Sequence, residues 1–314
     1  MGFCASCGTC AATLAGWPPR REVPVSVSAS HSDRPLLIVN ADDYGLTDGV
    51  SAAIVDAAER GIVTSTSVIA LGPGFGSSVR RLADVATLGV GVHFAAVGED
   101  PPLLSAAEIP SLVDRSGRLW ASWRQFLPRA ASGRINPDDL AREFSAQLDA
   151  VRGAGVDVDH IDTHQNLHLW PMVRDVVMGI GDTAGVQRIR VTRSDQRGPV
   201  GVVVRRLARD LEAVCDAKGW RYTTASTGLD EAGTLDADGM VASLGRLRAG
   251  AGFASGASAE LATHPGVLTD GDRARYQWGY RWEEEYAALC SPNVRDAVDR
   301  LGFRLGTFAD LGSA

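Results

Sequence analysis

The 314-residue sequence predicts an α/β fold in which helices surround a parallel sheet or barrel. From Leu36 onward, short runs typical of β-strands alternate with helical patterns, as expected of parallel strands joined by helices. With 45% hydrophobic residues, a chain of this length can bury a full core, as one barrel-sized domain or as two smaller domains. No internal repeat is present, and no clear linker follows residue 35.

Two helices in the first half of the chain carry capping signals. Thr47 can cap a helix that ends at Arg60, before a glycine. Asn136 can cap another, with Pro137 at its first position, that extends to residue 152. The other elements of this half follow from short apolar or β-branched runs and from helical spacing. They are strands at 36–40, 62–70, 89–94 and 156–161 and a helix at 77–88.

The second half continues the alternation of strands and helices. Pro171 begins a helix, and further helical patterns occupy 202–218, 236–248, 281–290 and 293–300. Strand-like runs lie between them, at 187–192, 220–224, 258–263 and 303–306. This order of elements places the carboxyl ends of successive strands on one face of the sheet or barrel, where α/β enzymes carry their active sites.

We expect residues 1–34 to form a disordered leader and residues 35–314 to form the folded domain, with an irregular insertion around 95–136 that forms a wall of the site. The leader lacks the basic start and long apolar core of a secretory signal, so a cytoplasmic location is expected. Its Cys4, Cys7 and Cys10 could hold a metal or a cluster, but no fourth ligand lies nearby.

The charge and hydropathy of the chain exclude two classes of partner. A net charge of −7 and a pI near 5.4 argue against nucleic acid and against an anionic membrane surface. No apolar stretch approaches the roughly 20 residues that span a bilayer. We therefore expect a soluble protein.

Asp42 and Asp43 stand side by side where the first predicted strand empties into a loop. Two adjacent carboxylates repel one another unless a cation or a shared proton relieves the repulsion. The pair could also make only local hydrogen bonds at the entry to a helix. Its position at a strand end favours a metal site.

Three of the six histidines, His93, His164 and His264, fall at or just after the ends of separate predicted strands. Each alone could be a structural residue, but strand ends of such folds converge, so we expect the three to share one site with the two aspartates. One Asp and two His can hold a divalent cation with positions open for water and substrate. The second carboxylate could then act as a base toward metal-bound water, which predicts hydrolysis. Asp162 could orient one of the imidazoles from behind.

Five segments around these residues resemble the YdjC-like carbohydrate deacetylases, which include chitooligosaccharide and hopanoid-biosynthesis deacetylases. They occur in the order of that family, and the resemblance covers about 35–312. The segments are Asn40-Ala41-Asp42-Asp43-Tyr44-Gly45-Leu46, Gly61-Ile62-Val63-Thr64-Ser65-Thr66-Ser67, Gly91-Val92-His93-Phe94, His160-Ile161-Asp162-Thr163-His164-Gln165-Asn166-Leu167-His168 and Glu260-Leu261-Ala262-Thr263-His264-Pro265-Gly266.

The resemblance implies an α/β fold, a distorted (β/α) barrel of the polysaccharide-deacetylase type in a single domain. It also implies metal-dependent hydrolysis in which metal-activated water attacks the amide carbonyl of an N-acetylated sugar. By position, Asp43, His93 and His164 correspond to the metal ligands and Asp42 to the general base. His264 corresponds to the general acid or to a stabiliser of the departing amine. The cofactor would be one divalent ion, Zn or Mg, with Fe or Co as further candidates. Asn166 departs from the family pattern, which often has a third histidine there.

The expected partner is an N-acetylated mono- or oligosaccharide, and a homodimer is left open. His168, Arg193, Tyr44 and Trp123 are predicted to contribute to substrate binding, since aromatic faces suit sugar rings and Arg193 follows a predicted strand. Two other functions remain open on the residues alone. One is a metal-dependent phosphoesterase, although no glycine-rich phosphate loop or basic cluster is present. The other is a catalytically inactive carbohydrate-binding protein.

Overall fold

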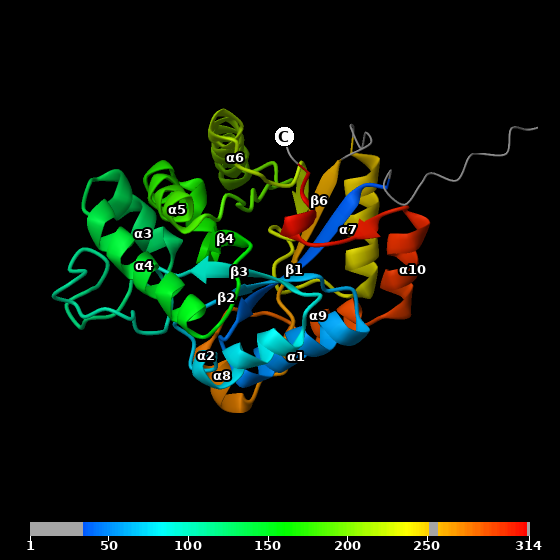
Figure 1. Cartoon of the computed structure of the whole chain (residues 1–314), viewed down its shortest axis with the longest axis horizontal. Helices are drawn as coiled ribbons and strands as arrows, with labels where there is room; N and C mark the ends of the chain where they lie inside the picture. Colours follow the sequence, from blue (N-terminus) through cyan, green and yellow to red (C-terminus); the bar gives the residue numbers. More distant parts are fainter. Residues whose placement is uncertain (1–33, 251–256, 313–314) are drawn as a thin grey trace, which may run out of the picture.

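Parallel strands form the centre of the computed structural model, which describes residues 34–250 and 257–312 (Figure 1). The strands lie in the order β4-β3-β2-β1-β6-β5, and β7 pairs with the first residues of β1. Every pairing is parallel, so the carboxyl ends of the strands meet on one face. The strands are β1 Leu36–Tyr44, β2 Ser65–Val68, β3 Gly89–Phe94, β4 His160–Thr163, β5 Ala225–Thr227, β6 Ser258–Thr263 and β7 Arg304–Leu305.

Isolated bridges carry the sheet from β4 around toward β5. Ile161 of β4 pairs with Ile189, and Arg188 pairs with Arg221, both in parallel. Together with the curled sheet, these bridges make the distorted barrel, which confirms the predicted fold class. The fully formed strands expected at 187–192 and 220–224 are wrong. At the end of the second segment, the backbone N–H of Thr224 donates to the Ser258 hydroxyl rather than to a backbone carbonyl of a neighbouring strand.

Helices surround the sheet (Figure 1), and the two predicted caps are confirmed by their hydrogen bonds. The Thr47 hydroxyl accepts a hydrogen bond from the N–H of Val50, and the Asn136 side chain accepts from the N–H of Asp138. The helices are α1 Asp48–Arg60, α2 Phe75–Ser78, α3 Trp123–Ala131, α4 Pro137–Gly153, α5 Pro171–Ala184, α6 Pro199–Lys218, α7 Ala237–Ala249, α8 Asp270–Arg275, α9 Trp282–Leu289 and α10 Pro292–Arg300, with 3₁₀ segments η2 Val79–Asp84, η3 His164–Leu169 and η4 Phe308–Asp310.

The segment 95–136, between β3 and α4, contains the helix α3 and is bound to the core. Glu143 of α4 accepts hydrogen bonds from the backbone N–H groups of Leu103 and Leu104. Gln147, one turn further along α4, exchanges two hydrogen bonds with the backbone of Ala95. These buried polar side chains satisfy backbone groups of an irregular segment, which fixes it beside the barrel mouth.

Two predictions concern parts of the chain that lie outside the described residues. These are the disorder of residues 1–34, apart from Arg34, and the roles considered for Cys4, Cys7 and Cys10. Among the described residues, no helix combines the length and the apolar character that crossing a membrane requires.

Candidate active site

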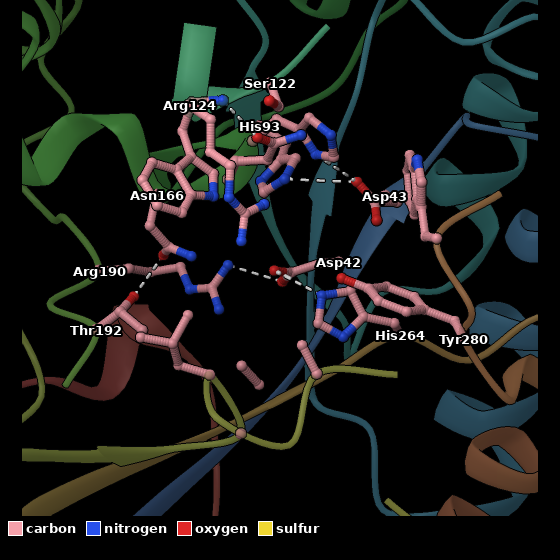
Figure 2. Close-up of a pocket in the computed structure, with 18 residues that line it drawn as sticks. Asp42, Asp43, His93, Ser122, Arg124, Asn166, Arg190, Thr192, His264 and Tyr280 are labelled. Carbon is pink, nitrogen blue, oxygen red and sulfur yellow. Dashed lines mark hydrogen bonds and ion pairs between the residues drawn. The ribbon is translucent and has the colours of Figure 1, made fainter. Parts of the chain in front are cut away.

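Both acidic residues of the first strand face the same cavity. β1 continues to Tyr44, so Asp42 and Asp43 lie within its last residues rather than after it. Successive side chains of a regular strand point to opposite faces. Here the β1–β2 register shifts between Ala41 and Tyr44, and Asp43 has a φ of +69°. This irregularity breaks the alternation, so both carboxylates line one cavity (Figure 2).

Left-handed backbone is concentrated at this site. In 34–250 and 257–312, the non-glycine residues with positive φ are Asp43, Gln165 and Asn166. All three line the same cavity. Such conformations are costly for residues with a side chain and persist where the surrounding structure fixes them. The backbone is therefore strained where the cavity is lined.

Asp43, His93 and His164 form a cluster whose candidate ligand atoms all lie within 4.8 Å of one another. Asp43 Oδ1 lies 3.5 Å from His93 Nε2 and 3.4 Å from His164 Nδ1. Two ligands bound tetrahedrally at about 2.0–2.1 Å to one ion would stand roughly 3.3–3.4 Å apart. Asp43 Oδ1 is buried and has no hydrogen-bond partner among the described residues. The three side chains thus fit a divalent metal ion.

The charge state of Asp43 agrees with this arrangement. Its side chain is 1% exposed, and burial alone would raise its pKa. The contacts with His164 and the charge of His93 outweigh burial and lower the pKa of Asp43 to about 2. Asp43 is therefore ionised at neutral pH, as a ligand for a cation must be.

Asp162 of β4 holds His93 from behind. Its Oδ1 lies 2.6 Å from His93 Nδ1, which leaves His93 Nε2 facing Asp43. Burial would lower the pKa of His93, but the charge and hydrogen bond of Asp162 raise it to about 9. A carboxylate on the far nitrogen of an imidazole fixes its tautomer and its orientation, as is common for metal-binding histidines.

Asp42 is held separately from the cluster, through its Oδ1 atom. This oxygen accepts from Asn40 Nδ2 at 2.7 Å and from Arg190 Nη1 at 2.7 Å. The other oxygen, Oδ2, lies 3.8 Å from His264 Nε2 (Figure 2). One oxygen of Asp42 is therefore anchored, while the other lies beside the imidazole of His264.

Arg190 connects Asp42 with Asp162, the residue that orients His93. Its side chain is 2% exposed and also pairs with Asp162 and with Glu260 of β6. The same nitrogen, Nη1, thus contacts both Asp42 and the carboxylate that orients His93, while Nε contacts Glu260. A buried Arg with three carboxylate partners fixes their positions relative to one another.

His264 follows β6 directly and stands opposite Asp42. Its backbone N–H donates to Glu285 of α9 at 2.9 Å, and its ring meets that of Tyr280 edge to face with centroids 5.0 Å apart. Its Nδ1 is buried with no partner among the described residues. Burial lowers the pKa of His264, an effect that the charges of Asp42 and Asp43 partly offset.

These groups surround a cavity of about 340 Å³ (Figure 2). Aromatic side chains form part of its wall, namely Trp123 of α3, Trp278 and Tyr280. Trp282 is buried behind them, 5.1 Å from Tyr280 between ring centroids. The cavity combines a polar floor with flat walls, which suits a hydrophilic ligand with apolar faces.

The structure brings together six of the residues selected from the sequence and leaves three apart. Asp42, Asp43, His93, His164, His264 and Trp123 line the cavity. Tyr44 is buried and donates to the carbonyl of Ser78. His168 is buried between the Thr163 hydroxyl and the carbonyl of Arg190. Arg193 pairs with Glu212 and lines a different hollow.

Sequence reasoning missed Asn40, Arg190, Glu260 and Glu285. A signal existed for Arg190, because a charged residue inside a predicted buried strand, Gln187 to Thr192, requires a partner. Glu260 gave the same signal within 258–263. Glu285 gave none, because it lies on an amphipathic helix where one glutamate resembles another.

Fold and site together define an α/β barrel with a candidate metal site at the carboxyl ends of its strands. The chain belongs to the YdjC-like protein family, whose model matches residues 36–300.

Named relatives match nearly over their whole length. A chitooligosaccharide deacetylase of Enterobacter sp. (strain 638) is 30% identical over 281 residues, which cover 88% of this chain and 99% of the relative. A chitooligosaccharide deacetylase of Serratia marcescens is 28% identical over 279 residues, again 88% and 99%. A solved structure from Enterococcus faecalis V583, described as a cellobiose-phosphate cleavage protein, aligns with a TM-score of 0.73 at 24% identity, covering 89% of this chain and 99% of that one. The similarity to this solved structure is evidence for the fold.

Proposed function

We propose that this protein is a metal-dependent carbohydrate deacetylase that hydrolyses the acetyl amide of an N-acetylated mono- or oligosaccharide. Full-length relatives named as chitooligosaccharide deacetylases support the reaction class. The observation that carries the proposal is that the two adjacent aspartates have different contacts. Asp43 belongs to the metal-type cluster, whereas Asp42 has its own partners and points one free oxygen into the cavity.

Asp43, His93 and His164 would hold one divalent ion. When bound, such an ion supplies a Lewis acid that polarises a carbonyl group and makes water more acidic. Two imidazoles and one carboxylate suit Zn²⁺, Fe²⁺ or Co²⁺, whereas Mg²⁺ prefers oxygen ligands alone. We therefore favour Zn²⁺, Fe²⁺ or Co²⁺ over Mg²⁺.

Asp42 acts as the general base in this proposal. Its Oδ1 is occupied by Asn40 and Arg190, so Oδ2 is the atom that accepts a proton from the attacking water. The water oxygen forms a bond to the acetyl carbon. Positioned general bases contribute about 10²–10⁴-fold to such reactions.

His264 acts as the general acid. Its Nε2 lies 3.8 Å from Asp42 Oδ2, so the acid and the base stand side by side in the cavity lining, within reach of the same reacting group. As the carbon–nitrogen bond breaks, His264 donates a proton to the leaving nitrogen. The products are acetate and a sugar with a free amine. Trp123, Trp278 and Tyr280 would hold the sugar ring by its apolar faces.

The test is acetate release by protein that has been stripped with a chelator and reloaded with Zn²⁺, Co²⁺, Fe²⁺ or Mg²⁺ in turn. Substrates are N-acetylglucosamine and its β-1,4-linked dimer and trimer. We expect acetate and free amine in equal amounts, only after reloading. Absence of acetate from every pairing of metal and sugar would overturn the proposal.

Asp42→Asn is the diagnostic variant. We expect it to bind metal as the wild type does and to lose about 10²–10⁴-fold in kcat, because the amide keeps the hydrogen-bond geometry but cannot accept the proton. Asp138→Asn, at the exposed start of α4, is the matched control and should keep full activity. Near-normal turnover in Asp42→Asn would sink the base assignment.

A further inference from the structure

Ser67 of β2 lies beneath the cavity and contacts residues that support both Asp42 and His93. Its side chain is fully buried and does not line the cavity. The hydroxyl accepts a hydrogen bond from Asn40 Nδ2 at 3.0 Å and donates one to Asp162 Oδ2 at 2.8 Å. Asn40 also donates to Asp42, and Asp162 holds His93. Ser67 therefore links the amide that anchors one aspartate with the carboxylate that orients a candidate metal ligand.

These contacts close into a ring of hydrogen bonds. Asp42 Oδ1 accepts from Asn40 Nδ2 and from Arg190 Nη1, each at 2.7 Å (Figure 2). Arg190 Nη1 also donates to Asp162 Oδ2, the oxygen that Ser67 contacts. The ring thus runs from Asp42 through Asn40, Ser67, Asp162 and Arg190 and returns to Asp42, and all five side chains are buried. The amide nitrogen and the guanidinium nitrogen each carry two hydrogens, and each has two acceptors within the ring.

The ring passes over the intervening strand at a glycine. In the sheet, β3 lies between β2 and β4. Gly91 of β3 pairs in register with Ser67 on one side and with His160 on the other. A Cβ atom at Gly91 would lie 2.3 Å from His160 Nε2, so no side chain fits there. The space above this glycine allows the Ser67 hydroxyl to reach Asp162 on β4 and to lie 3.3 Å from His160 Nε2.

We propose that Ser67 is a positioning residue for deacetylation, which fixes the general base and a metal ligand relative to each other through this ring. The inference rests on the proposed function. Since Ser67 does not line the cavity, it reaches the reacting groups only through its neighbours. It acts on His93 through Asp162 and on Asp42 through Asn40. Members of a buried hydrogen-bond network depend on one another, so the loss of one hydroxyl should be felt at both ends.

The base depends on Ser67 because the Asn40 side chain has few other contacts. Its Oδ1 atom is buried and has no hydrogen-bond partner in 34–250 and 257–312, so Asp42 and Ser67 orient the amide through Nδ2. Without the Ser67 hydroxyl, one hydrogen of this nitrogen loses its acceptor, which is costly in a buried site. The amide can then rotate, and the free oxygen of Asp42 is no longer fixed. Because Ser67 does not contact the substrate, this change should lower kcat and leave KM unchanged.

The experiment compares Ser67→Ala with Ser65→Ala. Ser65 lies on the same strand and is equally buried, but its hydroxyl has no hydrogen-bond partner among the described residues. Competition with a chromophoric chelator measures Zn²⁺ affinity, and acetate release from the N-acetylglucosamine dimer is followed at Zn²⁺ concentrations that saturate each variant. We expect Ser67→Ala to lose about 10-fold in Zn²⁺ affinity and about 10-fold in kcat, with KM unchanged. Ser65→Ala should match the wild type in all three quantities.

Combined variants test the route through the ring. In an Asp162→Asn background, Ser67→Ala should change Zn²⁺ affinity by less than about twofold, because the contact through which it acts is already weakened. In an Asp42→Asn background, Ser67→Ala should likewise leave the residual kcat within about twofold, because the base that it positions is gone. A residue that only stabilised the barrel would lower these quantities by the same factor in every background.

The outcomes distinguish this inference from the proposed function. Wild-type Zn²⁺ affinity and kcat in Ser67→Ala would overturn the positioning role, and so would an equal loss in Ser65→Ala. Losses that multiply fully in Ser67→Ala/Asp162→Asn would also overturn it, because Ser67 would then act independently of Asp162. If the wild type released no acetate from any sugar, the deacetylase function would fail, and the Zn²⁺ affinities would still decide whether Ser67 acts on the metal ligand. If Ser67→Ala did not fold, Ser67→Cys, which has a similar size and a weaker donor, would provide the same comparison.

Discussion

Individual side chains in this site divide into those that face the cavity and those that hold them. Asp43, His93 and His164 supply one potential ligand atom each. Behind them, Asp162 orients His93 and Arg190 links Asp162 to Asp42. The supporting residues matter because a ligand rotated by a small angle no longer meets its ion.

Replacing Asp162 by Asn tests this support. The amide keeps the size of the side chain but removes the charge that holds His93 Nδ1, so we expect metal affinity to fall about 10–100-fold. Competition with a chromophoric chelator for Zn²⁺ measures the change. Asp159→Asn is the matched control, because Asp159 pairs with His160, which lies outside the cluster. Equal Zn²⁺ affinities of Asp162→Asn and Asp159→Asn would show that Asp162 does not orient His93 for metal binding.

Sequence alone predicted the three cavity histidines because strand ends converge by topology, whatever the details of packing. It could not predict that Asp42 and Asp43 face the same way, because consecutive residues of a regular strand diverge. Only the register shift and the positive φ at Asp43 bring them together. Nor could it show that Arg190 points inward while Arg193 points to Glu212, since that depends on the irregular segment that carries them.

At the scale of elements, the first part of segment 95–136 is joined to the segment that carries the aromatic wall. The Asp100 carboxylate accepts from the Arg275 guanidinium and from the Tyr276 hydroxyl at 2.9 Å. Next to it, Glu99 accepts from Trp278 Nε1 at 3.0 Å. Two segments more than 170 residues apart in sequence thus form one side of the cavity mouth.

Asp100→Asn should loosen this connection. Tyr276 and Arg275 lose a charged acceptor, so we expect the free energy of unfolding to fall by about 1.5–3 kcal/mol. Faster amide hydrogen exchange is expected in 95–122 and in 276–281, together with a higher KM for oligosaccharides. Asp114→Asn, an exposed residue of the same insertion with only local hydrogen bonds, should leave all three unchanged. Unaltered exchange in both segments of Asp100→Asn would contradict the connection.

Some elements in and around segment 95–136 could be predicted from the sequence, and others could not. The role of the segment as a wall was expected from its length and composition, whereas α3 was not, because Pro128 inside it reads as a helix breaker. The caps at Thr47 and Asn136 were predictable because capping is a local interaction. Extended segments were predicted at 187–192 and 220–224, but not that they would make only isolated bridges, at 188, 189 and 221, because that depends on closure of the whole barrel.

The molecule as a whole brings three separate segments of chain to the metal cluster, at the ends of β1, β3 and β4. An ion bound only by the folded state should therefore stabilise the entire barrel. At a free Zn²⁺ concentration 100 times the dissociation constant, the expected gain is about 2.7 kcal/mol.

Urea unfolding with chelator and with Zn²⁺ measures that gain. Asp43→Asn should abolish it while keeping the fold, since Asn tolerates the left-handed backbone at this position. Asp138→Asn, at the exposed start of α4, is the comparison, and it should preserve the metal response. If Zn²⁺ stabilised Asp43→Asn against urea as much as it stabilises the wild type, the ion would have to bind elsewhere.

The left-handed backbone at Asp43 restricts which residues could replace this aspartate in evolution. A residue such as Glu or Cys placed there would carry a backbone penalty of about 1–2 kcal/mol before its chemistry counted. Exchange of this ligand is therefore disfavoured by conformation as well as by coordination. The backbone conformation of one strand therefore helps to determine which metal the site binds. Substitutions in the walls of the cavity carry no such penalty, so substrate preference can change more easily than metal preference.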